Sequence, residues 1–127
     1  MATLKTNTLT GTSTAGSIAV TGEGNSTTTN LQQGLAKMWA NVDGTGTAAL
    51  DDSFNASGLT DNGTGDFTVA INNDMSNADY SCQFNGNSAH VGLTAIATGS
   101  LRVFVTAAND SSQDVDPVTY LAHGDLA

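Results

Sequence analysis

Residues 50–80 read LDDSFNASGLTDNGTGDFTVAINNDMSNADY and decide the fold class of this chain. Phe67, Val69 and Ile71 alternate with smaller or polar residues, as expected for a strand with one buried face. Before them, residues 61–66 (DNGTGD) combine the residue types that favour tight turns between strands. The stretch therefore predicts a β-hairpin, and it offers no cluster of residues suited to catalysis.

The same period of two recurs along the rest of the chain, between clusters of Gly, Asn, Asp and Ser. The predicted faces comprise Ala48, Leu50, Phe54 and Ala56 (with Asp52 interrupting), then Tyr80, Cys82 and Phe84, then Leu101, Val103 and Val105, and finally Val118, Tyr120 and Ala122. Short strands separated by turns predict a mainly β fold. We expect an antiparallel, jelly-roll-like β-sandwich over residues 30–127.

A helical spacing leads into the predicted sandwich. The apolar residues at intervals of three and four are Leu31, Leu35, Met38, Trp39 and Val42. This spacing predicts a short helix over about residues 30–42, which Gly34 weakens. The apolar stripe of an isolated helix of this length needs a surface to pack on. That surface is either the sandwich itself or the same stripe in a neighbouring subunit.

Residues 1–29 form a separate compositional unit, rich in Thr, Ser, Gly and Ala. Its spaced apolar residues are Leu4, Leu9, Ile18 and Val20. Such a segment buries too little apolar surface to offset the entropy of ordering its backbone. Because a simple linker needs no such residues, the pattern favours an extended anchoring arm that becomes ordered on a partner.

The charge balance excludes several classes of partner. The chain has 127 residues and a formal net charge of −9, and its only Lys and Arg residues are Lys5, Lys37 and Arg102. So few cations give almost no electrostatic support for binding nucleic acid or an anionic membrane.

No apolar run approaches the ~20 residues of a membrane helix, and the start lacks the apolar segment of a signal peptide. We therefore expect synthesis in the cytoplasm.

The sequence predicts no catalytic, cofactor or metal site. Cys82 is the only Cys and lies in an alternating run, so we expect a small core residue and no disulfide within the chain. His90 and His123 lack ligands at metal-binding spacing, and the acidic run at residues 61–66 lacks the closing Glu of a calcium loop. We expect a protein that is not an enzyme.

Three segments resemble small tail-fibre-like and virion proteins of marine tailed bacteriophages. They read LQQGLAKMW, NVDGTGTAALDDSFNASGLTDNGTGDFTV and MSNADYSC, and the opening MATLKTNTLTGTSTAG is also similar. The ordered string DSFN followed by LTDNGTGDFTV carries most of the resemblance, which covers about residues 1–82. The resemblance implies a virion structural component and no catalytic or ligand residues.

A capsid decoration (cement) protein, which binds and stabilises the assembled head, is the function we expect. The short chain beginning with its own Met1 favours this role, and a tail-fibre or tail-tip component for host attachment is the alternative. The expected partner is the major capsid protein or another virion protein, bound by a homotrimer. The predicted interface residues are Leu4, Leu9, Ile18, Val20, Leu31, Leu35, Met38 and Trp39.

Trp39 has two competing roles in this scheme. It is either a core residue under the sandwich or an anchor at a subunit interface, a role that aromatic residues often fill. A third class of function, a carbohydrate-binding sandwich, requires aromatic residues exposed on one face. The candidates for that role are Tyr80, Tyr120 and Trp39, but the two tyrosines lie in core-like patterns.

Overall fold

A computed structural model describes residues 3–14, 17–87 and 89–127 of the chain. The chain divides into two compact units, Met1–Leu35 and Ala36–Ala127, called here the N-terminal unit and the sandwich unit. The sequence placed this division between residues 29 and 30. It falls after the short helix instead, because that helix continues directly from a strand of the N-terminal unit.

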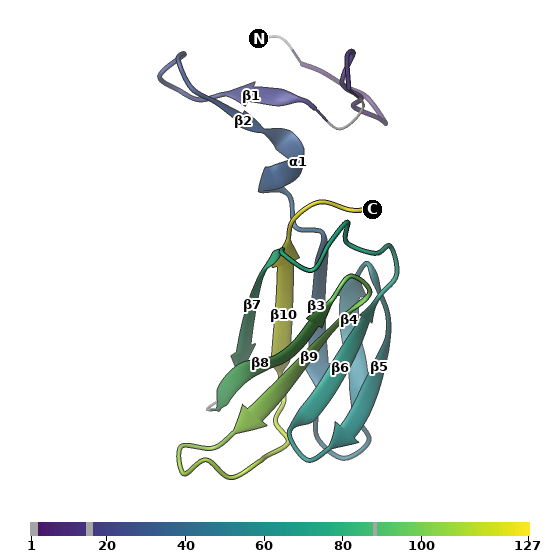
Figure 1. Ribbon diagram of the computed structural model, residues 1–127, viewed down its shortest axis with the longest axis vertical. Coiled ribbons are helices and arrows are strands. Elements are labelled where there is room, and N and C mark those ends of the chain that lie inside the picture. The colour runs from purple at the N-terminus through teal and green to yellow at the C-terminus, as the bar shows by residue number, and fades with distance from the viewer. Residues whose placement is uncertain (1–2, 15–16, 88) are drawn as a thin grey trace. The chain divides into compact units, whose positions relative to one another are not determined.

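The N-terminal unit contains a small antiparallel hairpin followed by one turn of helix (Figure 1). Strand β1 (Ala19–Thr21) pairs with β2 (Thr28–Asn30), and the helix α1 spans Leu31–Gly34. Asn30 caps the helix, since its side-chain oxygen accepts a hydrogen bond from the backbone N–H of Gln32 at 2.8 Å. Two paired strands of three residues are a marginal sheet by themselves.

The predicted helix over residues 30–42 is therefore mostly wrong. Only four residues are helical, and β3 (Met38–Asp43) is a strand. The segment 38–42 fits a period of two as well as a helical one, because Met38, Ala40 and Val42 alternate. The segment forms a strand because neighbouring strands pair with β3 on both sides, and this pairing buries every second residue.

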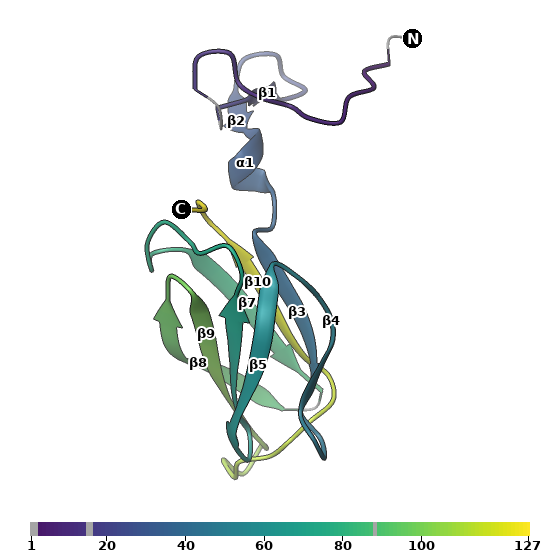
Figure 2. The same cartoon turned by 90° about the vertical axis from the view of Figure 1, so that its right-hand side faces the viewer.

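The sandwich unit is formed by two four-stranded antiparallel sheets that face each other (Figures 1 and 2). The first sheet has the order β4-β3-β10-β7, with β4 (Ala49–Phe54), β10 (Val118–His123) and β7 (Ser81–Gly86). The second has the order β5-β6-β9-β8, with β5 (Ala56–Gly63), β6 (Asp66–Ile71), β9 (Ser100–Thr106) and β8 (His90–Ala97). The predicted mainly β, antiparallel sandwich is confirmed. Three pairs of consecutive strands form hairpins: β3–β4 in the first sheet, and β5–β6 and β8–β9 in the second.

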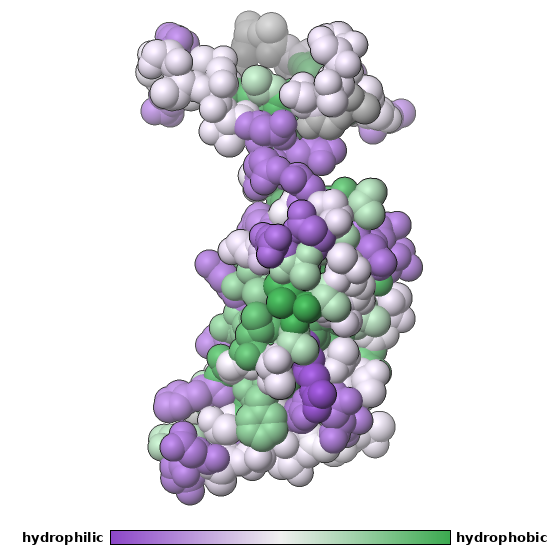
Figure 3. Space-filling model, in the orientation of Figure 1, coloured by the Kyte–Doolittle hydropathy of each residue, from purple (hydrophilic) through white to green (hydrophobic). Residues whose placement is uncertain are grey.

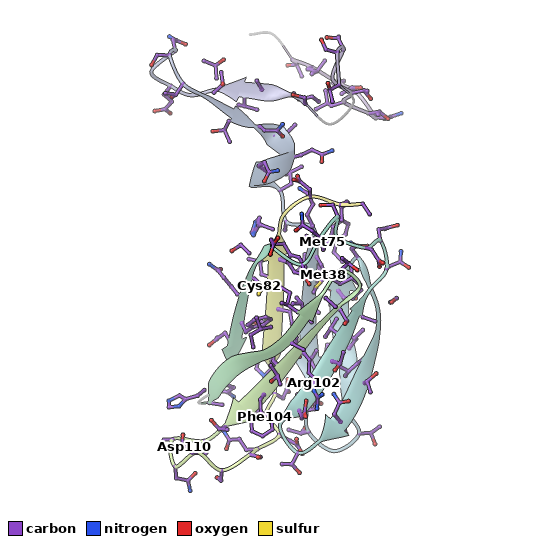
Figure 4. The ribbon with its side chains drawn as sticks, in the orientation of Figure 1. Met38, Met75, Cys82, Arg102, Phe104 and Asp110 are labelled. Atoms are coloured by element: carbon purple, nitrogen blue, oxygen red, sulfur yellow. The ribbon has the colours of Figure 1, made fainter. Side chains whose placement is uncertain are left out.

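One core lies between the two sheets. Its fully buried residues alternate along the central strands as predicted, and include Phe67, Val69, Leu101, Val103, Val105, Val118 and Tyr120. The ring of Phe84 meets that of Tyr120 edge-on, with centroids 5.4 Å apart. The hydroxyl of Tyr80 donates a hydrogen bond to the backbone oxygen of Ala97 at 2.8 Å. Met38 and Met75 lie toward one end of this core (Figure 4).

Asn55 forms the corner where the chain leaves the first sheet for the second. Its backbone has a φ of 56°, a left-handed conformation that Asn tolerates better than most residues. Its side-chain amide donates to the backbone oxygens of Lys37 (2.9 Å) and Asn73 (3.1 Å). Its side-chain oxygen accepts from the backbone N–H of Asn73 at 2.8 Å. The last residue of the DSFN string therefore ties three segments together.

Candidate interaction surfaces

Large apolar side chains of the N-terminal unit remain open to solvent. Leu4 is 77% exposed, Leu9 and Leu35 are each 53% exposed, and Val20 is 48% exposed. Ile18 and Leu31 are half-buried. These six residues are the part of the predicted interface that the structure places in this unit.

Four of these apolar residues surround one hollow of about 300 Å³ in the N-terminal unit. The lining residues are Thr6, Asn7, Thr8, Leu9, Ile18, Leu31, Gln32 and Leu35. A second hollow of about 240 Å³ lies between β2 and α1 and is lined by Val20, Leu31 and Leu35 among others. The spaced apolar residues of the sequence thus gather beside concave surfaces, although they lie far apart along the chain.

Met38 and Trp39, the remaining predicted interface residues, lie in the sandwich unit and face opposite ways. Met38 is fully buried in the core, so it is not accessible to a partner in the folded chain. Trp39 is 37% exposed on the outward face of the first sheet. The proposal that Trp39 is a core residue is therefore wrong, whereas its role in binding a partner stays a prediction.

Phe54 also faces outward, contrary to the sequence pattern. The pairing of β3 with β4 shifts by one residue, because Asn41 lies opposite Asp52 whereas Val42 lies opposite Leu50. The extra residue is a β-bulge, which reverses the side-chain alternation along β4. Leu50 therefore packs against the core while Phe54 is 52% exposed. Asp52, which interrupted the predicted inward face, also points outward.

The bulge creates two rows of side chains across the outward face of this sheet. We define the aromatic row as Phe54, Trp39, Leu121 and Gln83, which are register partners on the four adjacent strands. We define the polar row, two residues further along each strand, as Asp52, Asn41, Thr119 and Asn85. Adjacent side chains within a row lie close enough to act together. Neither row contains a Lys or Arg.

The outward face of the second sheet is chemically different. Small residues such as Gly58, Ala70 and Ala97 occupy much of it, and Phe104 is 38% exposed. Apolar surface gathers in the middle of this unit in Figure 3. Leu93, on the edge strand β8, is 45% exposed. Figure 4 shows Arg102 and Phe104 on β9. Arg102 donates to both carboxylate oxygens of Asp66, one of them at 2.7 Å, which lowers the pKa of Asp66.

The candidates for reactive chemistry do not converge. Cys82 faces the core from β7, whereas His123 of β10 points to the opposite side of the same sheet. Burial raises the pKa of the Cys82 thiol, which disfavours the nucleophilic thiolate. His90 lies on the other sheet. The register therefore brings neither His onto the inward face beside Cys82.

The acidic loops are used for structural contacts. The side chain of Asp61 accepts the backbone N–H of Gly63 at 2.9 Å, and that of Asp114 accepts the backbone N–H of Gly65 at 2.7 Å. Within the described residues, His, Cys, Asp and Glu side chains form no group of three or more that could hold a metal ion. No helix in the same part of the chain is long and apolar enough to cross a bilayer.

Comparison of the chain with models of protein families, with curated proteins and with solved structures found no match. The N-terminal hollows and the aromatic row both carry exposed large apolar side chains beside polar ones.

Proposed function

We propose that this chain is a non-enzymatic structural protein of a bacteriophage virion, a capsid decoration protein that binds and stabilises the assembled head. In this role the N-terminal unit is the anchor and the sandwich unit is the outward body. The resemblance of residues 1–82 to virion proteins supports the proposal that the chain is part of a virion. Synthesis takes place in the host cytoplasm, and the partner is the major capsid protein or another virion protein.

The exposure of Leu4, Leu9, Val20 and Leu35 is the observation that carries this proposal. Each is about half exposed or more, and the described part of the unit that holds them has a small hairpin and one helical turn as its regular structure. Covering these side chains on a partner removes apolar surface from water, at about 25 cal/mol for each Å². An anchor of this kind gains most of its order and its free energy of binding on the assembled surface.

Binding only to the assembled shell stabilises that shell by mass action, because free capsid subunits lack the site. A homotrimer presents three anchors at once, and each bound anchor raises the effective concentration of the others. Weak contacts by single N-terminal units then suffice for full occupancy. Sedimentation of the purified chain tests the trimer directly.

The experiment that tests the anchor replaces Leu4, Leu9, Val20 and Leu35 by Ser in the full-length chain. Because the sandwich core contains none of these residues, we expect an unchanged thermal midpoint of the sandwich and a loss of attachment to virion heads. Leu93→Ser is the matched control, since Leu93 is similarly exposed but lies on β8. Full occupancy by the Ser variant would contradict the anchor.

The copy number separates the head from the tail. Quantitative mass spectrometry of purified virions should give a number of copies comparable to that of the capsid subunits. A number that matches a tail structure would support the alternative, a tail-fibre or tail-tip component. The outward aromatic row is the feature that favours this alternative, since host attachment requires an exposed recognition surface.

A further inference from the structure

The outward face of the β4-β3-β10-β7 sheet carries exposed aromatic and polar side chains, and it is separate from the N-terminal anchor. Trp39 and Phe54 are direct register partners, and both are more than a third exposed. A large aromatic ring open to water loses the free energy that burial would give it. Trp39 faces outward by the regular alternation of β3, and the bulge in β4 brings Phe54 to the same side. Two exposed aromatic rings side by side indicate a face on which another molecule packs.

We propose that this face binds a neutral glycan chain, with the rings of Trp39 and Phe54 as the stacking platform and the amide and carboxylate groups of the neighbouring positions as hydroxyl partners. A sugar ring presents C–H groups on its faces and hydroxyls around its rim. The C–H groups pack on aromatic faces, whose surface carries partial negative charge. Hydroxyls both donate and accept hydrogen bonds, as do the side-chain amides of Asn and Gln.

The polar row and the end of the aromatic row supply groups of the required kind. Gln83, Asn85 and Asp52 are exposed, so their side chains are available to a ligand lying across the strands. Their carboxylate and amide groups accept from hydroxyls, and the amide nitrogens donate to them. The two rows run across four strands, which favours an extended chain over a single small molecule.

Charge selects among the possible occupants. The rows carry Asp52 and no Lys or Arg, so a phosphorylated, sulfated or uronic-acid polymer is disfavoured. A second copy of this chain packed on this face would bring a further Asp52 carboxylate close to the first, with no Lys or Arg in either row to offset the repulsion. A neutral, hydroxyl-rich polymer meets neither penalty.

Asn41 supplies an independent sign that this face is not optimised for stability alone. Its side-chain oxygen is buried and has no hydrogen-bond partner among the described residues. An unsatisfied buried acceptor costs about 1–3 kcal/mol, and each such group in a folded protein calls for an explanation. Asn41 lies between Asp52 and Thr119 in the polar row, at the bulge that turns Phe54 outward.

Trp39 makes the proposal directly testable, because it is the only Trp in the chain and its fluorescence reports on this face. The full-length protein is titrated with four neutral soluble polysaccharides: dextran, laminarin, mannan and galactomannan. We expect at least one of them to shift the fluorescence emission of Trp39 and to protect it from quenching. The same polysaccharide should slow the migration of the protein in affinity electrophoresis. Phe54→Ala should weaken that binding about tenfold or more, as for truncation of an interface aromatic residue.

Phe104→Ala is the matched control, since Phe104 is 38% exposed on the outward face of the other sheet. It should leave the affinity unchanged, and circular dichroism should show that both variants remain folded. Three results would overturn the proposal: no response to any of the four polysaccharides, equal losses in Phe54→Ala and Phe104→Ala, or a Trp39 emission that changes with protein concentration alone. The last result would identify a second copy as the occupant.

Discussion

The N-terminal unit and the sandwich unit both contain large apolar side chains, but these side chains are largely exposed in the first unit and form a buried core in the second. In the sandwich, Phe67 and Leu101 are fully buried between two sheets. In the N-terminal unit, Leu4 and Leu9 are more than half exposed beside a two-stranded hairpin. The difference shows that an apolar residue stabilises a fold only where enough partners surround it. Where they are absent, the same residue is left free for another molecule.

Hydrogen exchange should separate the two units by the largest margin. Amides of β6 and β9 lie at the centre of a sheet, so we expect them to exchange only through global unfolding, which costs about 5–15 kcal/mol in typical domains. Amides of β1 and β2 should exchange with opening free energies near zero, because two short strands are marginally stable. Equal protection in β1 and β6 would mean that the N-terminal unit folds as firmly as the sandwich, which would undermine its role as an anchor ordered on a partner.

Replacing a buried ring should cost far more than replacing an exposed one. We expect Phe67→Ala to destabilise the sandwich by about 3–5 kcal/mol, because the residue is fully buried. Phe104→Ala, which removes the same ring from the outward face, should cost less than about 1 kcal/mol. Urea unfolding monitored by circular dichroism measures both. Similar losses would show that the outward face of β9 is not open to solvent.

Two Asn residues with the same backbone conformation should differ because they lie in different units. Asn25 and Asn55 both have a φ of 56°. We expect Asn55→Ala to destabilise the sandwich by about 2–4 kcal/mol, since it removes the hydrogen bonds to Lys37 and Asn73 and strains the corner. Asn25→Ala should leave the unfolding midpoint of the sandwich unchanged. Asn55→Gly, which keeps the left-handed backbone, should recover part of the loss.

The tyrosines should make the sandwich sensitive to alkali. Burial raises the pKa of Tyr80 to about 12 and raises that of Tyr120 as well. The folded state therefore favours the neutral phenols, a contribution that is fully present below the ordinary pKa of 10.0 and lost as the pH rises towards the folded values. Because the chain has two Tyr residues, ultraviolet absorbance should show little tyrosinate near pH 10 while the protein is folded. Normal titration of either residue in the native protein would contradict the predicted burial.

The smallest effect concerns the ion pair on the second sheet. The guanidinium of Arg102 lowers the pKa of Asp66, so the pair stabilises the fold above the ordinary Asp value of 3.8 and ceases to do so as the pH falls through the lowered value. Since the Arg102 side chain is 42% exposed and its charge is screened by water, we expect Arg102→Gln to cause only a small loss of stability at neutral pH. Lys5→Gln, which removes a cation from the N-terminal unit, should have no effect on the sandwich. A loss for Arg102→Gln that persists at strongly acidic pH would point to packing instead of charge.

Much of the sandwich could be predicted because its central strands follow the simplest pattern in proteins. Phe67, Val69 and Ile71 alternate with polar or small residues, and only one register buries all three. The interface residues were harder to predict, since exposure depends on what the rest of the chain covers. Met38 and Trp39 are neighbours in sequence and looked alike in a helical pattern, yet one is in the core and the other faces solvent.

The amino-acid sequence alone determined the class of fold, the positions of the turns and the poverty of the first residues in apolar side chains, because these depend on local alternation and composition. Only the tertiary structure decided which way the aromatic residues of β3 and β4 point. A strand rather than a helix forms over Met38–Asp43 because β10 and β4 are there to pair with it. Phe54 turns outward because one extra residue in β4 shifts its register against β3. Both outcomes follow from contacts between segments, which no pattern within a single segment records.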